Sequence, residues 1–128
     1  MIAYAMAAMM LVQSSPHQFD LHCTGATYVT REGGQQTSTP FAETYRLDLR
    51  RGAWCTGNCS VVEEILDMSP TALVIELRGH GRGISDVTIN RTTGRYRANA
   101  DFEVLRSNVL TVGQCERQPF SGIPQARF

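Results

Sequence analysis

The sequence predicts an all-β protein: a small antiparallel β-barrel or sandwich of about seven or eight strands, stapled by disulfides. Three observations predict it. Short segments in which apolar and polar residues alternate recur along the chain, and no helical stretch of about 10–15 residues separates them. The four cysteines form an even set, as in exported disulfide-bonded proteins. The 128 residues have the length of one domain.

The N-terminal residues 1–12 (MIAYAMAAMMLV) carry no charged side chain. The run is shorter than the roughly 20 residues of a membrane-spanning helix, and it fits the apolar core of a signal peptide. Val12 and Ser14 have the spacing of a cleavage site. We therefore expect residues 1–14 to be a secretory signal peptide and residues 15–128 a single β domain, periplasmic or secreted, with no membrane span after cleavage. The alternative is a buried N-terminal helix of a cytosolic protein.

The first predicted strand places Phe19, Leu21 and Cys23 at alternate positions. Residues 31–40 (REGGQQTSTP) are polar and predict a loop. Residues 45–50 have the clearest period of two in the chain and predict the second strand. We expect both strands to bury one face.

Residues 61–68 (VVEEILDM) fit two structures, because their apolar residues suit either a short strand or one and a half helical turns. Residues 72–77 (ALVIEL) predict a central strand, since they are apolar and partly β-branched.

Residues 86–90 and 95–100 alternate in phase around the loop 91–94, which predicts a β-hairpin. Residues 109–115 predict the last strand. A disulfide between the first and last strands suits a sheet closed on itself, so a barrel is preferred to a sandwich.

The four cysteines allow three disulfide pairings. Cys55 and Cys59 are close in sequence, and a Gly-Asn pair between them can form a tight turn that brings them into bridging range. Cys23 and Cys115 then join the first and last strands. We therefore expect two structural disulfides, Cys55–Cys59 and Cys23–Cys115.

A metal or redox site is the alternative for Cys55 and Cys59. Three intervening residues are compatible with a zinc pair, but no matching Cys/His pair follows in the sequence. The corresponding enzyme hypothesis is a small metal-binding or hydrolytic enzyme that uses these cysteines with His80 and His22.

The segment 79–83 (GHGRG) has the glycine content of a phosphate-binding loop, but it leads into a strand instead of a helix. A plain hairpin loop is the simpler interpretation. If the loop binds a ligand, His80 and Arg82 would hold a small anion together with exposed backbone N–H groups. One strand separates this loop from the hairpin 91–97, so the two lie at opposite ends of that strand.

All twelve basic residues are arginine, which excludes a Schiff-base or phosphate-loop lysine. The formal net charge of zero gives no long-range attraction to nucleic acid or an anionic membrane. Two arginine pairs share outward strand faces and would either contact an anion or a protein or form ordinary surface. These pairs are Arg46 with Arg50 and Arg95 with Arg97.

Four segments together resemble short, uncharacterised exported proteins of alphaproteobacteria: YRLDL, WCTGNC, INRTTGRY and GQCERQPFSG. The resemblance covers most of residues 19–122 and assigns no activity. The chain is also faintly similar to periplasmic lysozyme inhibitors, which are small disulfide-bonded β-barrels with one cysteine early and one near the end. Their inhibitory loop carries Ser-Gly-x-x-Tyr, whereas residues 93–96 read Thr-Gly-Arg-Tyr, so no inhibitory residue is assigned.

We therefore expect a non-enzymatic exported binding module for a protein, an envelope component or a small ligand, with no metal, cofactor or nucleic-acid partner. The alternatives are the small enzyme described above, a lysozyme-inhibitor-like protein and a structural envelope protein.

Overall fold

The computed structural model describes residues 16–78, 84–102 and 106–124. Within these ranges the chain forms nine β-strands and no helix, so the all-β prediction is confirmed, with a slightly higher strand count than predicted. The strands are β1 (Gln18–Arg31), β2 (Gln36–Asp48), β3 (Ala53–Thr56), β4 (Glu63–Glu64), β5 (Asp67–Met68), β6 (Ala72–Arg78), β7 (Ile84–Asn90), β8 (Arg95–Phe102) and β9 (Ser107–Gln118).

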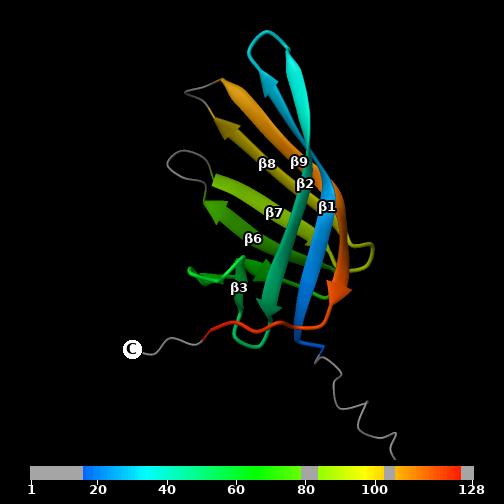
Figure 1. Cartoon of the computed structure of the whole chain (residues 1–128), viewed down its shortest axis with the longest axis vertical. Coiled ribbons are helices and arrows are strands. Elements are labelled where there is room, and N and C mark those ends of the chain that lie inside the picture. The colour runs from blue at the N-terminus through cyan, green and yellow to red at the C-terminus, as the bar shows by residue number, and fades with distance from the viewer. Residues whose placement is uncertain (1–15, 79–83, 103–105, 125–128) are drawn as a thin grey trace, which may run out of the picture.

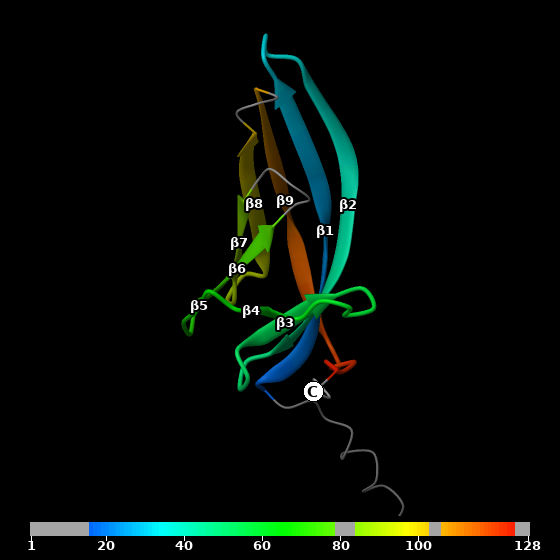
Figure 2. The ribbon, with the colours of Figure 1, turned by 90° about the vertical axis from the view of Figure 1, so that its left-hand side faces the viewer.

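All nine strands belong to one antiparallel sheet, in the order β4-β3-β2-β1-β9-β8-β7-β6-β5. The sheet curls into a half-barrel: β1 and β2 face β6, β7 and β8, while β3, β4 and β5 cross one end, here called the base (Figures 1 and 2). The structure therefore resembles the predicted barrel in curvature, but the sheet is single and open, not a sandwich of two sheets. The first and last strands are neighbours at its middle, and its edges are β4 and β5.

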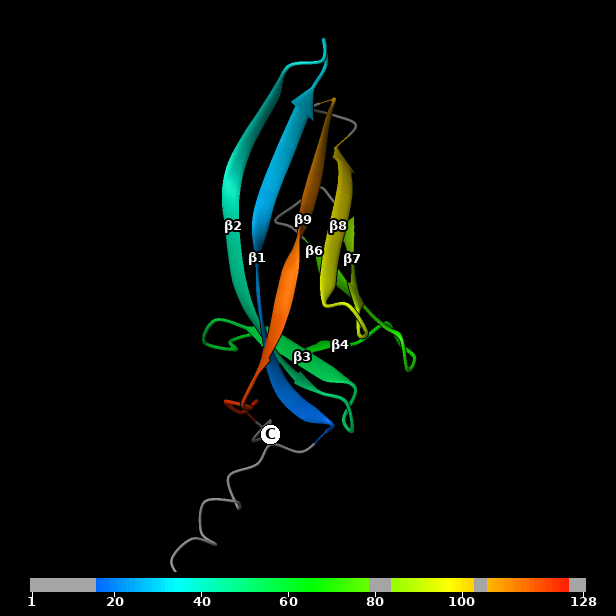
Figure 3. The same cartoon turned by 90° about the vertical axis from the view of Figure 1, so that its right-hand side faces the viewer.

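The two strands at the middle of the sheet are joined covalently. Cys23 on β1 lies directly opposite Cys115 on β9, and the two form the predicted disulfide. On its other side β9 pairs with β8, so it links the β1–β2 hairpin to the β6–β7–β8 meander (Figure 3). The predicted hairpin around residues 91–94 is the β7–β8 turn of this meander.

Strand β2 begins earlier than the sequence predicts, because residues 36–40 continue it instead of forming a loop. Thr39 pairs with Thr27 on β1, and β-branched residues suit a pleated sheet. Pro40 lacks an N–H donor, which is tolerated at a sheet edge. It lies at such an edge, since β3 pairs with β2 only through residues 45–48.

Residues 61–68 form neither of the two expected elements in full. They hold the two short edge strands, β4 paired with β3 and β5 paired with β6. Ile65 and Leu66 connect these strands and donate their backbone N–H groups to the carbonyls of Gly52 and Val74. The chain itself therefore crosses the base between the two edges of the sheet.

The core lies on the concave face, where the period-two pattern places alternate strand residues. Its buried members are Phe19, Leu21, Cys23, Tyr45, Leu47, Leu49, Trp54, Leu73, Ile75, Val87, Ile89, Tyr96, Ala98 and Cys115.

An aromatic bridge spans the concave face. Gly25 on β1 pairs with Gly113 on β9, and the residues that flank this pair in the same row are Phe41 on β2 and Tyr96 on β8. The ring centroids of Phe41 and Tyr96 are 5.0 Å apart. The hydroxyl oxygen of Tyr96 lies 2.5 Å from that of Tyr45. Burial raises the pKa of both tyrosines above the usual value.

The segment that follows β9 runs back past the lower ends of β1 and β2 (Figure 1) and is held by two residues of the sheet. Asp20 accepts hydrogen bonds from the backbone N–H and the hydroxyl of Ser121. Arg46, directly opposite Asp20 on β2, donates to the carbonyl of Gly122 at 3.1 Å. A second, smaller apolar cluster forms here, with buried members Ala53, Cys55, Cys59 and Ile123.

No helix among the described residues is long and apolar enough to cross a membrane. The two disulfides fit an oxidising compartment. The expected signal peptide, residues 1–14, lies outside the described residues.

Candidate functional site

The predicted anion-binding residues His80 and Arg82 lie outside the described residues, with the whole segment 79–83. The sequence also predicts that this segment and the 91–97 hairpin lie at opposite ends of one strand, and that strand, β7, is described. β7 leads away from that segment, and the β7–β8 turn lies at its other end, near the base (Figure 2).

Cys55 and Cys59 form the predicted local disulfide. Gly57 has a φ of 61°, and the backbone N–H of Cys59 donates to the carbonyl of Thr56, so a tight turn joins the two cysteines. Both cysteines are buried, and sulfurs in a disulfide supply no thiolate to a metal. In the ranges that the structure describes, no group of three or more His, Cys, Asp or Glu residues could hold a metal ion.

His22 is half-buried on the convex face of β1, and its Nδ1 lies 2.9 Å from the Thr44 hydroxyl oxygen. It lines a shallow hollow of about 320 Å³ with Arg46 and Ser121. Both of these neighbours already have hydrogen-bond partners: Arg46 donates to the carbonyl of Gly122, and Ser121 donates to Asp20. The hydrogen bond to Thr44 makes His22 part of a contact between strands. Two carboxylates lie near it: Glu43 lines the same hollow, and Glu116 is directly opposite His22 on β9.

The two arginine pairs have different environments. Arg46 donates to two backbone carbonyls, at 2.8 and 3.1 Å, and therefore anchors neighbouring chain segments. Arg50 is exposed in the turn after β2. Arg95 and Arg97 are exposed on the convex face of β8 and line an open hollow of about 500 Å³.

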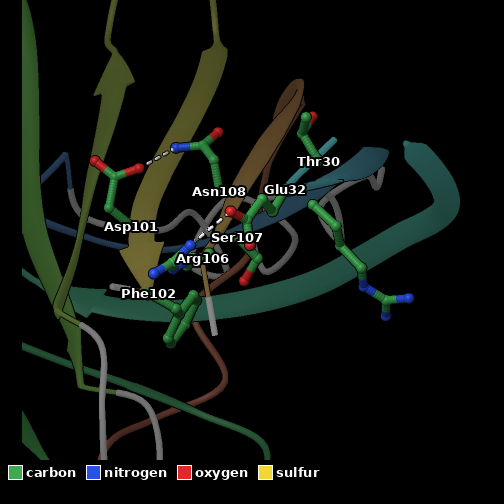
Figure 4. Close-up of a pocket in the computed structure, with 8 residues that line it drawn as sticks. Thr30, Glu32, Asp101, Phe102, Arg106, Ser107 and Asn108 are labelled. Atoms are coloured by element: carbon green, nitrogen blue, oxygen red, sulfur yellow. Dashed lines mark hydrogen bonds and ion pairs between the residues drawn. The ribbon is translucent and has the colours of Figure 1, made fainter. Parts of the chain in front are cut away.

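The end of the half-barrel opposite the base carries an open polar pocket of about 490 Å³ (Figure 4). Four of the side chains that line it are already paired with one another. Arg106 Nη1 lies 2.6 Å from Glu32 Oε1, and Asn108 Nδ2 donates to Asp101 at 2.5 Å. The ion pair is solvent-exposed, so water competes with any ligand for these charges. This pocket offers a ligand few unpaired groups.

A more enclosed pocket, here called the base pocket, lies at the base of the half-barrel and has a volume of about 350 Å³. It is built by β1, β6, β9 and the β7–β8 turn. Its lining residues are Phe19, Leu21, Leu73, Ile89, Asn90, Arg91, Thr92, Thr93, Gly94, Cys115 and Arg117. The first four are core residues, so the floor of the pocket is apolar.

The rim of the base pocket is formed largely by the β7–β8 turn. Asn90 Oδ1 accepts the backbone N–H groups of Thr92 and Thr93, at 2.8 and 2.9 Å. The carbonyl of Asn90 also accepts the N–H of Gly94, which closes the turn. Since the amide oxygen of Asn90 is used in this way, the other polar atom of its side chain is a donor.

Two arginines from different elements line this pocket. Arg91 Nη1 donates to the carbonyl of Ser69 at 2.7 Å, which ties the turn to the segment before β6. The guanidinium carbon of Arg117, on β9, lies 4.6 Å from the centre of the Phe19 ring, within the range of a cation–π contact. Among the described residues that line the pocket, the charged side chains are these two arginines, in a chain of zero net charge.

Among the described cavities, the base pocket joins a floor of core residues to a rim of cationic groups. No family model, curated protein or solved structure matches the chain. The lining of the pocket would suit a molecule with an apolar part and hydrogen-bond acceptors.

Sequence reasoning does not bring the residues of the base pocket together, because they come from four separated segments. One signal for it exists in the sequence. Arg117 follows Cys115 by two residues, so the period of two places both on the inner face if the strand continues. The last strand is predicted to end at Cys115, whereas β9 continues to Gln118.

Proposed function

We propose that this protein is an exported, non-enzymatic binding module that holds a small ligand in the base pocket. The observation that carries the proposal is one cavity of about 350 Å³ lined by both core side chains and two arginines. Protein pockets for small molecules are typically concave and apolar, with a few polar groups that orient the ligand. The volume lies near the lower end of their usual range of about 300–1,000 Å³.

The walls of the pocket are held by covalent and hydrogen bonds. Cys115 lines the pocket and is bonded to Cys23, so a disulfide fixes β1 against β9 beneath it. The hydrogen bonds of Asn90 fix the turn that forms the rim. Walls that are ordered before binding reduce the entropy lost when a ligand enters.

Export is part of the proposal, and it is supported by the apolar residues 1–12 and by the two disulfides. Mass spectrometry of the full chain expressed in a Gram-negative host tests it. We expect a mature N-terminus at Ser15, within about two residues, in the periplasmic or secreted fraction. Recovery of intact chains starting at Met1 from the cytosol would contradict export.

Ligand binding is tested by titrating the ¹⁵N-labelled oxidised protein with a panel of small molecules and following amide shifts by NMR. We expect shifts at Ile89, Arg91, Gly94 and Arg117, which line or adjoin the base pocket. The internal control is the hollow on the convex face of β8, represented by Arg97. Shifts confined to that hollow would locate the site elsewhere.

A protein partner is the second candidate, favoured by four exposed apolar side chains at or beside the edges of the sheet. Val61, Val62, Leu66 and Met68 are 62%, 40%, 53% and 42% exposed. Apolar side chains that gather at a surface commonly mark protein contacts. Cross-linking in an envelope extract tests this candidate: the adduct should be lost in Leu66→Ser and kept in Thr92→Ser, which changes the rim of the base pocket.

A further inference from the structure

We infer that the ligand of the base pocket is an amphipathic anion, with an apolar body and one terminal carboxylate or a similar acidic group. This inference rests on the proposed function and names its ligand class. It follows from the separation of apolar and cationic groups between the floor and the rim.

The floor selects the apolar body. Phe19, Leu21, Leu73 and Ile89 are at most 8% exposed, and all four line the cavity. A polar group placed on this floor would lose its water without gaining a hydrogen-bond partner, which is costly. Aliphatic or aromatic carbon would instead be removed from water, which is favourable.

The rim selects an anionic head. Among the described residues that line the pocket, the charged groups are the guanidiniums of Arg91 and Arg117. The Asn90 amide group adds a donor, because its oxygen is occupied by the turn. A guanidinium donates to a carboxylate through two parallel hydrogen bonds, and such charge-assisted bonds are stronger than neutral ones.

The two arginines also constrain how the ligand lies. Arg91 is fixed to the Ser69 carbonyl at one side of the rim, and Arg117 lies over the Phe19 ring at the floor side. A ligand whose carbon chain passes under Arg117 meets both the ring and the guanidinium. Its acidic group then ends at the β7–β8 turn. Size is no obstacle, since the cavity of about 350 Å³ is more than twice the roughly 150 Å³ of a cavity that holds benzene.

Three probes that share parts of this chemistry test the inference: octanoate, octan-1-ol and acetate. Each is titrated into the oxidised protein by calorimetry, with amide shifts recorded in parallel. Octanoate is ionised at pH 7. We expect it to bind about tenfold more tightly than octanol, which lacks the charge, and than acetate, which lacks the chain.

Arginine variants assign the effect to the rim. Arg117→Gln and Arg91→Gln are each expected to weaken octanoate binding by about tenfold and to weaken octanol binding much less, because octanol carries no charge for the guanidiniums. Arg117→Lys should keep part of the affinity, because it keeps the charge but loses the two-pronged geometry. The matched control is Arg95→Gln, which removes an exposed arginine of the same hairpin that does not line the pocket. Each variant is first checked for a dispersed NMR spectrum.

The outcomes separate the inference from the proposed function. If octanol binds as tightly as octanoate and the glutamine variants have no effect, the base pocket is a ligand site but its ligand is not an anion. If acetate binds as tightly as octanoate, the inference that the ligand has an apolar body is wrong. If none of the probes shifts the amides of the pocket but other members of the panel do, the ligand class is wrong. If no small molecule shifts them, the proposed function itself fails.

Discussion

Gly25 and Gly113 face each other across the β1–β9 ladder, and neither position has room for a side chain. A Cβ on Gly25 would overlap the carbonyl oxygen of Val112, and a Cβ on Gly113 would overlap that of Thr24. The two strands approach closely here, and beside them Phe41 and Tyr96 meet across the concave face.

Gly25→Ala is therefore expected to destabilise the protein by about 3 kcal/mol, the upper part of the usual cost of overpacking. The added methyl group meets backbone atoms, which cannot move aside as a flexible side chain does. Urea unfolding measures the loss. The control is Gly34→Ala, whose Cβ would meet nothing within 4 Å and whose positive φ of 85° adds a strain of about 1 kcal/mol. Equal losses in the two variants would contradict the close approach.

The two disulfides are expected to contribute unequally to the free energy of unfolding. Cys23 and Cys115 are 92 residues apart and Cys55 and Cys59 are four apart. The chain-entropy model gives about 4.7 kcal/mol for the long loop and about 2 kcal/mol for the short one. Replacing each pair by serine and comparing urea midpoints checks this. A larger loss for the local pair would show that its place in the second apolar cluster outweighs loop length.

Because the hydroxyls of Tyr45 and Tyr96 are hydrogen-bonded to each other, the effects of removing them on the free energy of unfolding are expected to be non-additive. Tyr45→Phe leaves the hydroxyl of Tyr96 buried without its partner, which costs about 1–3 kcal/mol. The double variant removes both hydroxyls, so it should cost clearly less than the sum of the two single variants. A double-mutant cycle of unfolding free energies measures the coupling. Additive losses would mean that the two hydroxyls do not depend on each other.

Asp48 is expected to make the stability depend on acidic pH. Although burial alone raises the pKa of its carboxyl group, hydrogen bonds from Gln18 and from the backbone N–H groups of Arg51 and Arg50 hold that pKa below its usual value. The stabilisation is therefore complete above the unfolded pKa of about 3.9 and is lost as the pH falls through the folded pKa.

Unfolding experiments between pH 2 and pH 6 on the wild type and on Asp48→Asn check this prediction. The difference in stability between the two should shrink toward the acidic end, because the carboxylate is then protonated in both states. Asp101→Asn is the matched control, since this carboxylate is exposed near the opposite end of the half-barrel. A difference that stays constant with pH would exclude an ionised Asp48 as the cause.

The sequence predicts local features well where one face of a strand is buried. Phe19, Leu21 and Cys23 alternate because the concave side is apolar, and Tyr45 and Leu47 do so for the same reason. Both disulfides are predictable from spacing. The start of β2 is missed, because the residues around Pro40 lie at a polar edge where neither face shows a pattern.

The base pocket is hidden from the sequence for a different reason. The sequence pattern marks Leu73 and Ile89 as ordinary core residues. That a cavity lies beside them depends on how the strands are placed relative to one another, which the pattern does not contain. Arg91 lies in the β7–β8 turn and Arg117 near the end of β9, and the two reach one pocket because β9 continues past Cys115. These are consequences of how segments pack, and no single segment carries them.

The pairing of the first strand with the last also limits when the Cys23–Cys115 disulfide can form during synthesis of the chain. A chain made from its N-terminus presents Cys23 long before Cys115, and Cys55 and Cys59 appear in between. An oxidant that joined cysteines as they emerge would produce Cys23–Cys55, whereas the native bonds are nested, one enclosing the other. The native pattern therefore requires either that Cys23 stay reduced until β9 is available or that a disulfide isomerase correct an early bond. The two halves of the sheet can form beforehand, but their union waits for the end of the chain.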